Sequence, residues 1–398
     1  MTLLVEFETV EGFTLDDPVK GVLDNVFFTL GGASFGDISS FVDAIGIARG
    51  KNRELDRYSA GQVSIQLNNR QRTFDPLYTS GQFYGQIIPR RQLRITVDGV
   101  RQFTGVIDDW NFDYDPGGDS IAEIVATDDF TLLARQILTD GTATPQLSGA
   151  RVSAVLNMPS VNWPLGRRDI GVGESALGAD VFGATTNALE YLQTVTTSEQ
   201  GQLFIDKDGD LTFLDRLQAT PTSTGLVTFA DDGTGIPYTR VNVNYGTELL
   251  VNTAEISSAA GTAVAQNNSS RGSYGVIEQT FDTLVSTFDQ LRNLADFIVR
   301  RFADPEYRFD SIEMNLDTLT TGHRATVLGL ELGRVVKIIF TPNDLGDPIE
   351  QFGQIIKLDH NIQQDRHDVT IGLASLDFTF LVLDDAQFGT LDSNSLAF

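Results

Sequence analysis

Four carboxylates stand close together in the stretch DDWNFDYD, at Asp108, Asp109, Asp113 and Asp115. Pairs of Asp or Glu supply the acid and the base or nucleophile of most glycoside hydrolases. Such a site also needs aromatic surfaces that hold the sugar and an acid whose pKa is raised by burial. Here the aspartates lead into the turn signal DPGGD, where water solvates them. The pattern therefore favours a structural turn over an active site.

A second acidic run, DKDGD beginning at Asp206, resembles the start of a calcium-binding loop. That loop requires glycine at its sixth position and an acidic residue at its twelfth. Leu211 and Leu217 occupy these two positions. The Asp208-Gly209 pair between two alternating apolar runs instead predicts a two-residue hairpin turn.

The three histidines, His323, His360 and His367, lack the spacing of a metal site, and we expect surface or interface positions for them. The chain also lacks a phosphate-binding loop, a G-x-S-x-G nucleophile motif and a dinucleotide-binding glycine motif. We therefore expect no enzyme activity, no metal and no cofactor. The function then depends on the shape and surface that the rest of the chain builds.

The composition favours a strand-rich, acidic protein. The chain has 398 residues, a formal net charge of −26, 37 Gly, 26 Phe and no Cys. Two to three domains are expected at this length, without disulfides or thiolate metal sites. The acidic charge opposes contact with phosphate, so we expect no specific nucleic-acid binding. The segment MTLLVEFETV lacks the basic region of a signal peptide, and no window is apolar enough for a membrane span.

Four strand-like segments recur in the same order in two parts of the chain, which predicts two copies of one β-domain. Val63, Ile65 and Leu67 alternate with polar residues in the first segment, as in a half-buried strand. The alternative is that unrelated amphipathic strands look alike. The segments that begin at Ala60, Pro89, Gln102 and Asp119 match those that begin at Phe309, Leu332, Gln351 and Arg366.

A shorter repeat flanks these copies. LDDPVKGVLDN and LDDAQFGTLDSN share Leu, Asp-Asp, Gly and Leu-Asp at identical spacing. They are either similar acidic turns or a pair of arms that dock into equivalent grooves. The candidate docking residues are Leu15, Asp16, Asp17, Leu383, Asp384 and Asp385.

The sequence also predicts helices between and within the strand-rich parts. One covers the stretch GATTNALEYLQTVTTSEQGQ, with Gly201 as a stop signal, and a shorter one closes the first β-domain at 128–138. Residues 259–275 are small and polar and predict a loop. Thr287 and Gln290 form a capping-box pattern for a helix over 287–303, which Pro305 ends.

Ten of the 28 Lys and Arg residues lie between Arg49 and Arg101, and most are Arg. Arg pairs with carboxylates through a planar fork, so an acidic chain can use such a cluster to meet acidic patches on its own copies. A solvated face is the main alternative, and a nucleic-acid patch lacks interleaved aromatic residues. The candidates for inter-subunit ion pairs are Arg53, Arg57, Arg70, Arg72, Arg90 and Arg91.

The stretch RGKNRELDRYSAGQVSIQLNNRQRTFDPLY resembles the opening module of minor tail proteins of long-tailed actinobacterial phages. ALEYLQTVTTSEQGQLFIDKDGDLTFLDR, LADFIVRRFADPEYR and VLDDAQFGTLD resemble later segments of the same proteins, so the resemblance extends over nearly the whole chain. These proteins are similar to the baseplate hub family of tailed phages. In that family one chain carries two tail-tube-like β-barrels, and three chains form a ring at the tail tip.

The resemblance implies a structural virion protein of the tail tip, assembled in the host cytoplasm. It would adapt the hexameric tail tube to a three-fold tip and form part of the DNA-ejection channel, through which genome DNA passes. The implied partners are two further copies, the distal tail protein ring, the C-terminus of the tape measure protein and other minor tail proteins. Many hub proteins carry additional C-terminal modules, and we expect none after residue 378.

Two other readings remain open, a hexameric distal tail ring protein and a β-rich glycan-binding or glycan-cleaving tip protein. The expected fold class is mainly β (α+β), with two tube-like β-barrels, a middle α+β region and a few helices. The expected domains are an N-terminal arm (1–30), the first barrel (31–138), the middle region (139–250), the second barrel with its helix (251–378) and a C-terminal arm (379–398).

Overall fold

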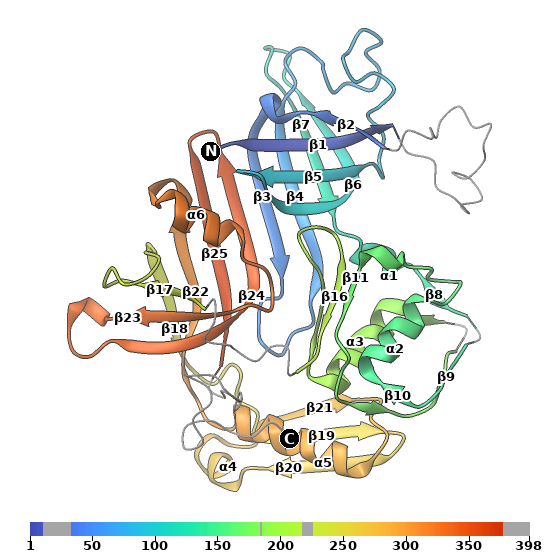
Figure 1. The fold of residues 1–398 in the computed structure, drawn as a ribbon, viewed down its shortest axis with the longest axis vertical. Coiled ribbons are helices and arrows are strands. Elements are labelled where there is room, and N and C mark those ends of the chain that lie inside the picture. Colours follow the sequence, from blue (N-terminus) through green and yellow to red (C-terminus); the bar gives the residue numbers. More distant parts are fainter. Residues whose placement is uncertain (11–32, 140, 184, 217–225, 377–398) are drawn as a thin grey trace.

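The computed structural model describes residues 1–10, 33–139, 141–183, 185–216 and 226–376. Strands dominate, and the largest sheet has 13 of them, so the expected mainly β fold class is confirmed. We call its two parts the N-lobe and the C-lobe (Figure 1). The N-lobe contains β1 (Leu3–Val10), β2 (Ser34–Asp37), β3 (Val42–Gly50), β4 (Ser59–Asn68), β5 (Gln92–Val97), β6 (Val100–Tyr114) and β7 (Ser120–Thr127). The C-lobe contains β17 (Val227–Ala230), β18 (Arg240–Tyr245), β22 (Tyr307–Asn315), β23 (Val335–Phe340), β24 (Ile349–Gln363) and β25 (Arg366–Ser375).

The two lobes repeat the same strand order. The N-lobe runs β3-β4-β7-β6-β5, and the C-lobe runs β18-β22-β25-β24-β23, with antiparallel pairing throughout both series. The long strands β6 and β24 each carry a bulge against their hairpin partner, at Asp108 and at Ile356. The order predicted from four sequence segments is therefore confirmed, and β3 and β18 add a fifth equivalent strand. The lobes differ outside this core, since β1 pairs antiparallel with β5 whereas β17 pairs parallel with β23.

The lobes form one continuous sheet because β24 pairs antiparallel with β3. The join depends on Gly50, which ends β3 at φ +117° beside the bulge of β24. A Cβ at this position would lie 2.1 Å from the Ile356 carbonyl oxygen, so only glycine fits there. The Lys51 amide donates to that same oxygen at 2.9 Å.

The middle region packs below the N-lobe (Figure 1). Its helices α2 and α3 pack on each other, and the β15–β16 hairpin turns at Asp208-Gly209, as predicted. The chain enters this region through α1 (Phe130–Leu133), which covers only part of the helix expected over 128–138. The region's helices are α2 (Ser148–Leu156) and α3 (Ala188–Glu199). Its strands are β8 (Ile137–Leu138), β9 (Thr142–Ala143), β10 (Gln146–Leu147), β11 (Arg168–Ile170), β12 (Ala176–Leu177), β13 (Asp180–Val181), β14 (Thr186–Asn187), β15 (Gln202–Ile205) and β16 (Leu211–Leu214).

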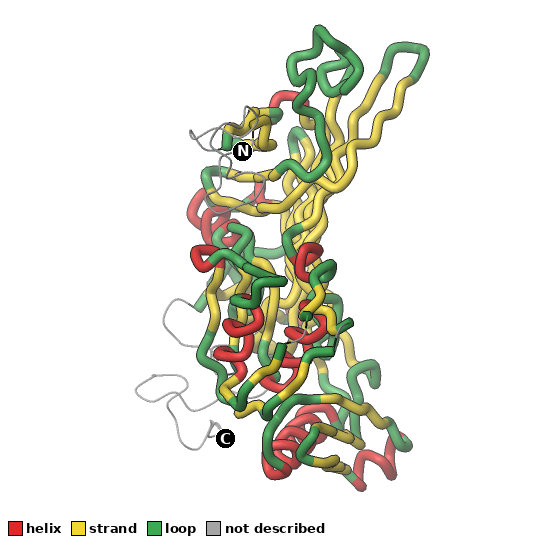
Figure 2. The backbone as a smooth tube through the Cα atoms, turned by 90° about the vertical axis from the view of Figure 1, so that its right-hand side faces the viewer, coloured by secondary structure: helices red, strands yellow, loops and turns green. Residues whose placement is uncertain are grey.

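A three-stranded sheet with α4 (Asn268–Tyr274) and α5 (Phe288–Phe302) lies at the end of the molecule farthest from β1 (Figures 1 and 2). Its strands are β19 (Thr253–Ser258), β20 (Gly261–Gln266) and β21 (Glu278–Asp282). Thr287 caps α5 by accepting from the Gln290 amide, as the sequence predicted. The loop expected over 259–275 is wrong, since β20 and α4 occupy most of it. Ala263 and Ala265 are small enough to pack beneath α5, and Asn267 caps α4.

The sheet does not follow the predicted domain boundary at residue 250. β17 and β18, expected in the middle region, pair with C-lobe strands, whereas β19 to β21 and α5 form the separate layer. Pairing across long sequence separations causes this difference, and the local pattern of β18 could not indicate it. The C-lobe also carries α6 (Thr321–Leu328). No helix among the described residues is long and apolar enough to cross a membrane.

Candidate assembly surface

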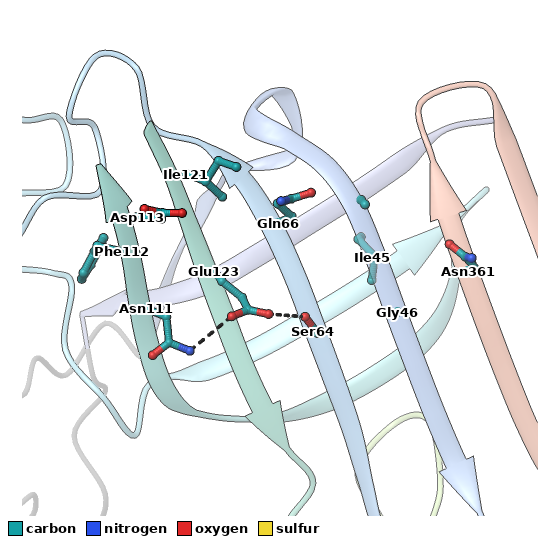
Figure 3. A pocket seen from close by; sticks show the side chains of 11 residues that line it. Ile45, Gly46, Ser64, Gln66, Asn111, Phe112, Asp113, Ile121, Glu123 and Asn361 are labelled. Carbon is teal, nitrogen blue, oxygen red and sulfur yellow. Dashed lines mark hydrogen bonds between the residues drawn. The ribbon is translucent and has the colours of Figure 1, made fainter. Parts of the chain in front are cut away.

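One side of the large sheet is open to solvent where β6, β7, β4, β3 and β24 lie next to one another. A shallow groove of about 510 Å³ runs over this side (Figure 3). The alternation of the strands directs most apolar residues inward and small or polar residues outward, and Ile121, opposite Asp113, is an apolar exception that lines the groove. We call these outward residues the polar face: Ala44, Gly46, Ser64, Gln66, Asn111, Asp113, Glu123 and Asn361.

Glu123 on β7 lies at the centre of the polar face. Its Oε1 accepts from the Ser64 hydroxyl at 2.9 Å, and its Oε2 accepts from the Asn111 side-chain amide at 3.3 Å (Figure 3). These bonds connect three adjacent strands through neutral donors. No Lys or Arg lines this groove, so Glu123 and Asp113 leave it negatively charged.

A second groove of about 470 Å³ lies over β3, β4 and β24, toward the opposite end of β3. Arg49, Lys51, Arg57 and Lys357 line it, together with Asp56. The basic segment identified in the sequence is therefore adjacent to the acidic groove on one sheet. The charge on the open side of the sheet changes sign along the strands.

Lys51 is held firmly in this second groove. Burial lowers the pKa of its ammonium group to about 8, although Glu54 and Asp56 oppose the shift. Its Nζ donates to the Glu54 carbonyl oxygen at 2.5 Å and lies 5.1 Å from the centre of the Tyr58 ring. The Lys51 side chain thus supports the local loop more than it serves as a free cation.

Among the described residues, ion pairs within the chain hold Arg53, Arg70, Arg72 and Arg90 of the candidate arginines. Arg53 contacts Glu248 at 2.7 Å and Arg70 contacts Asp119 at 2.8 Å. Arg72 contacts Asp75 at 2.6 Å and Arg90 contacts Asp108 at 2.9 Å.

The remaining two candidates, Arg57 and Arg91, make other contacts. Arg57 donates to the Gln193 side chain at 3.4 Å, and the Arg91 carbonyl accepts from the Ile107 amide at 2.8 Å. The six arginines do not meet in one place, although Arg53 and Arg57 lie close in sequence beside the second groove. Their contact with a neighbouring subunit stays a prediction. The predicted docking residues Leu15, Asp16, Asp17, Leu383, Asp384 and Asp385 lie outside the described residues.

Sequence reasoning missed the structural role of a buried arginine, Arg49, at the junction of the lobes. Arg49 is buried at the junction of the lobes, where its Nη2 donates to Glu331 at 2.7 Å and to the Ile205 carbonyl at 3.1 Å. The other Glu331 oxygen accepts from the Lys207 amide at 2.9 Å. A single hydrogen-bonded cluster therefore joins β3, the β15–β16 hairpin and the C-lobe. The place of Arg49 at the end of an alternating strand, at an inward position, was the available signal.

The expected surface positions of His360 and His367 are wrong. Both imidazoles are buried between β24 and β25, where Nδ1 of His360 lies 3.0 Å from Nε2 of His367. Burial lowers the pKa of His360 well below its usual value and that of His367 to about 4. The residues lie seven apart in sequence, and only the tight β24–β25 hairpin brings them together.

The acidic motifs behave as turns. The Asp206 side chain accepts from the amides of Asp208 and Asp210, and that of Asp115 accepts from the Gly117 amide. Burial raises the pKa of Asp206 to about 6. In the part of the chain that the structure describes, no group of three metal-ligating side chains is present.

The lobes, the helical middle region and the separate α/β layer together have a fold found in phage tail proteins. It occurs in the 43 kDa tail protein of prophage MuSo2 from Shewanella oneidensis, at 14% identity and a TM-score of 0.58 over 94% of this chain and 98% of that one. It also occurs in the tail protein from Neisseria meningitidis MC58, at 10% identity and a TM-score of 0.56 over 87% and 94% of the two chains. No family model and no curated protein sequence matches. At these identities the likeness establishes the fold, and the function is argued separately.

Proposed function

We propose that this chain is a structural protein of a phage tail tip, a baseplate hub of which three copies form a ring. The ring would join the hexameric tail tube to a three-fold tip. One observation carries the proposal: in a chain with the fold of tail proteins, the strand order of the N-lobe recurs in the C-lobe. Three copies then present six equivalent lobes to a six-fold tube, since closed rings are built from equivalent patches.

The polar face supports a place for this sheet along the DNA-ejection channel. Its lining contains no Lys or Arg, and Glu123 and Asp113 give it the same sign of charge as DNA. Like charge keeps DNA from adhering as it passes, whereas basic grooves retain phosphate. The Lys51 side chain in the second groove is held by its own loop, where its Nζ donates to the Glu54 carbonyl oxygen.

The neighbours in the tip follow from the same proposal. The distal tail protein ring would lie on the tube side, and the C-terminus of the tape measure protein would lie within the ring. Other minor tail proteins would dock through the arms around Leu15 and Leu383. The protein would be assembled in the host cytoplasm and remain in the virion tail tip, and its origin in an actinobacterial phage rests on the sequence resemblance alone.

The test is the native mass of the purified chain by light scattering at neutral pH and moderate salt, across a range of concentrations. One chain has a mass of 43.5 kDa, so the expected particle contains three of them. Six copies would favour the hexameric distal ring protein. A monomer that binds host-wall polysaccharide would favour the glycan-binding alternative.

A further inference from the structure

The long strand β24 has two neighbours on one edge. β23 pairs with residues 349–354, and β3 pairs with residues 357–363 beyond the bulge. The equivalent strand β6 has only the first of these neighbours, since β5 pairs with residues 100–106. Within the described residues, the edge of β6 from Asp109 to Tyr114 opposite β7 has no strand partner. The N-lobe thus lacks the strand that the C-lobe receives from β3.

The strand equivalent to β3 also has a free edge. β18 pairs with β22 as β3 pairs with β4, and among the described residues it is the terminal strand of the large sheet. An edge strand exposes a row of unpaired N–H and C=O groups that can accept another strand. The described part of each chain therefore has two unpaired strand edges, one on β18 and one on the second half of β6.

We propose that β18 of one copy pairs antiparallel with the second half of β6 in the next copy, repeating the β24–β3 join between chains. This inference rests on the proposed ring and names the edges that close it. The contact is head-to-tail, because β18 of one copy meets β6 of the next. Around the assembly, contacts between chains therefore alternate with the β24–β3 pairings inside chains, and the assembly closes into a ring when the rotation between neighbouring copies closes. The occupant of each free edge is a second copy of this chain.

The equivalence of the lobes fixes the register of this contact. The bulges align Asp108 with Ile356, and the β3–β4 and β18–β22 pairings align Gly46 with Asn242. Inside the chain Gly46 lies opposite Asn361, whose equivalent on β6 is Asp113. Asp113 of one copy is therefore placed opposite Asn242 of the next. The same register places Phe112 opposite Val243, Tyr114 opposite Val241, Trp110 opposite Tyr245 and Asp115 opposite Arg240.

The residues that meet in this register complement each other. On the core side, Tyr114 is 46% exposed and Tyr245 is 71% exposed, which is high for aromatic residues in strands. Val241 and Val243 are only partly buried in the single chain. Pairing would cover this apolar strip, while polar side chains on the other side extend the polar face. At the end of the contact, the exposed Arg240 would approach Asp115.

The glycine at the bulge recurs as well. Gly50, which lies against the bulge of β24, has Gly246 as its equivalent after β18. In the proposed register Gly246 lies beside Asp109, next to the bulge residue Asp108. A residue without a side chain, Gly246, is thus present at the position where the join inside the chain requires glycine.

The experiment uses the absence of Cys from the chain. Asp113→Cys and Asn242→Cys are introduced together in the full chain, and oxidised protein is examined by non-reducing electrophoresis and light scattering. Directly opposite residues in an antiparallel pair have Cα atoms about 4.5–5.5 Å apart, within disulfide reach. The control, Asn111→Cys with Asn242→Cys, is two residues out of register, where the distance of about 7–8 Å is too long.

The expected result is covalent oligomers in high yield for the matched pair and at least tenfold less for the control. Equal yields from both variants would overturn the register. A light-scattering trimer that forms no cross-link with the matched pair would overturn the strand pairing and leave the proposed ring standing. A chain that stays monomeric and uncross-linked at every concentration would overturn both proposals.

Discussion

Arg49 on β3 and Glu331 in the C-lobe form an ion pair of 2.7 Å at the point where the two lobes join. The Arg49 side chain is 5% exposed and that of Glu331 is 21% exposed. The pair is supported by the Ile205 carbonyl and the Lys207 amide, so the β15–β16 hairpin is tied to both lobes. The angle between the lobes is therefore set by a buried polar contact as well as by the β24–β3 pairing.

Replacing Arg49 with Met is expected to destabilise the chain by on the order of 3 kcal/mol, because it leaves a largely buried carboxylate without its cation. Arg53→Met is the matched control. Arg53 and Glu248 are also 2.7 Å apart, but both side chains are largely exposed, and such pairs contribute about 1 kcal/mol or less. Urea unfolding of the two variants measures the difference, and equal losses would contradict the role given to Arg49.

Replacing both Arg53 and Arg57 with Glu is expected to weaken self-association without changing the fold. Both residues are next to the basic groove, and reversed charge would repel an acidic neighbour. Light scattering at moderate salt measures the effect, with Arg292→Glu on α5 as the control because Arg292 is exposed, pairs with Asp296 and is outside the candidate set. Unchanged assembly of the double variant would remove these arginines from the interface.

Gly246→Ala is expected to prevent assembly while leaving the single chain as stable as before. In the single chain the nearest atom to an added Cβ is the Asn244 side-chain oxygen at 3.0 Å, which can move aside. In a contact that repeats the join at Gly50, the same Cβ would collide with the carbonyl of Asp108. Thermal unfolding and light scattering separate the two effects. Gly166→Ala, with no atom within 4 Å of its Cβ, is the control; an assembled Gly246→Ala variant would refute the bulge contact.

The buried pair of His360 and His367 is expected to make the fold sensitive to acid. The unfolded chain binds protons at these residues below about pH 6.5, whereas the folded chain resists protonation of His367 down to about pH 4. The stability contributed by the neutral pair is therefore full above pH 6.5 and is lost as the pH falls toward 4. The loss from His367 is at most about 3 kcal/mol, since each pKa unit corresponds to about 1.4 kcal/mol.

Asp128 has the opposite effect on the pH dependence of stability. Burial raises its pKa to about 7, so its contribution to the free energy of unfolding falls as the pH rises from about 4 to 7. Comparison of the native chain with His360→Gln/His367→Gln removes this background. The denaturation midpoints of the native chain and the double variant, measured at pH 7.5, 6 and 5, are expected to approach each other as the pH falls. Parallel curves would show that the imidazoles do not resist protonation in the fold.

Deleting residues 383–398 is expected to reduce incorporation of another minor tail protein into assembled tips, while the ring itself still forms. The basis is the repeated LDD motif at Leu15 and Leu383, which suggests equivalent docking arms. Mass spectrometry of purified particles measures the composition. Full incorporation of every partner would reject a docking role for this arm.

The sequence by itself determined the features that depend on neighbouring residues. Alternation at Val63, Ile65 and Leu67 predicted a strand buried on one face, and Thr287 with Gln290 predicted the beginning of a helix. The four-segment repeat was visible because each segment carries its own period and order. The repeat therefore predicted two lobes with the same strand order.

Only the tertiary structure decided which edges meet. The pairing of β24 with β3, the membership of β18 in the C-lobe and the contact of His360 with His367 arise between segments brought together by folding. Arg49 appeared to belong to a surface cluster with its sequence neighbours, yet it is buried against Glu331, 282 positions away. Strand periodicity specifies which face of a strand is apolar. It does not specify which strand lies beside it, because backbone hydrogen bonds are the same for every partner.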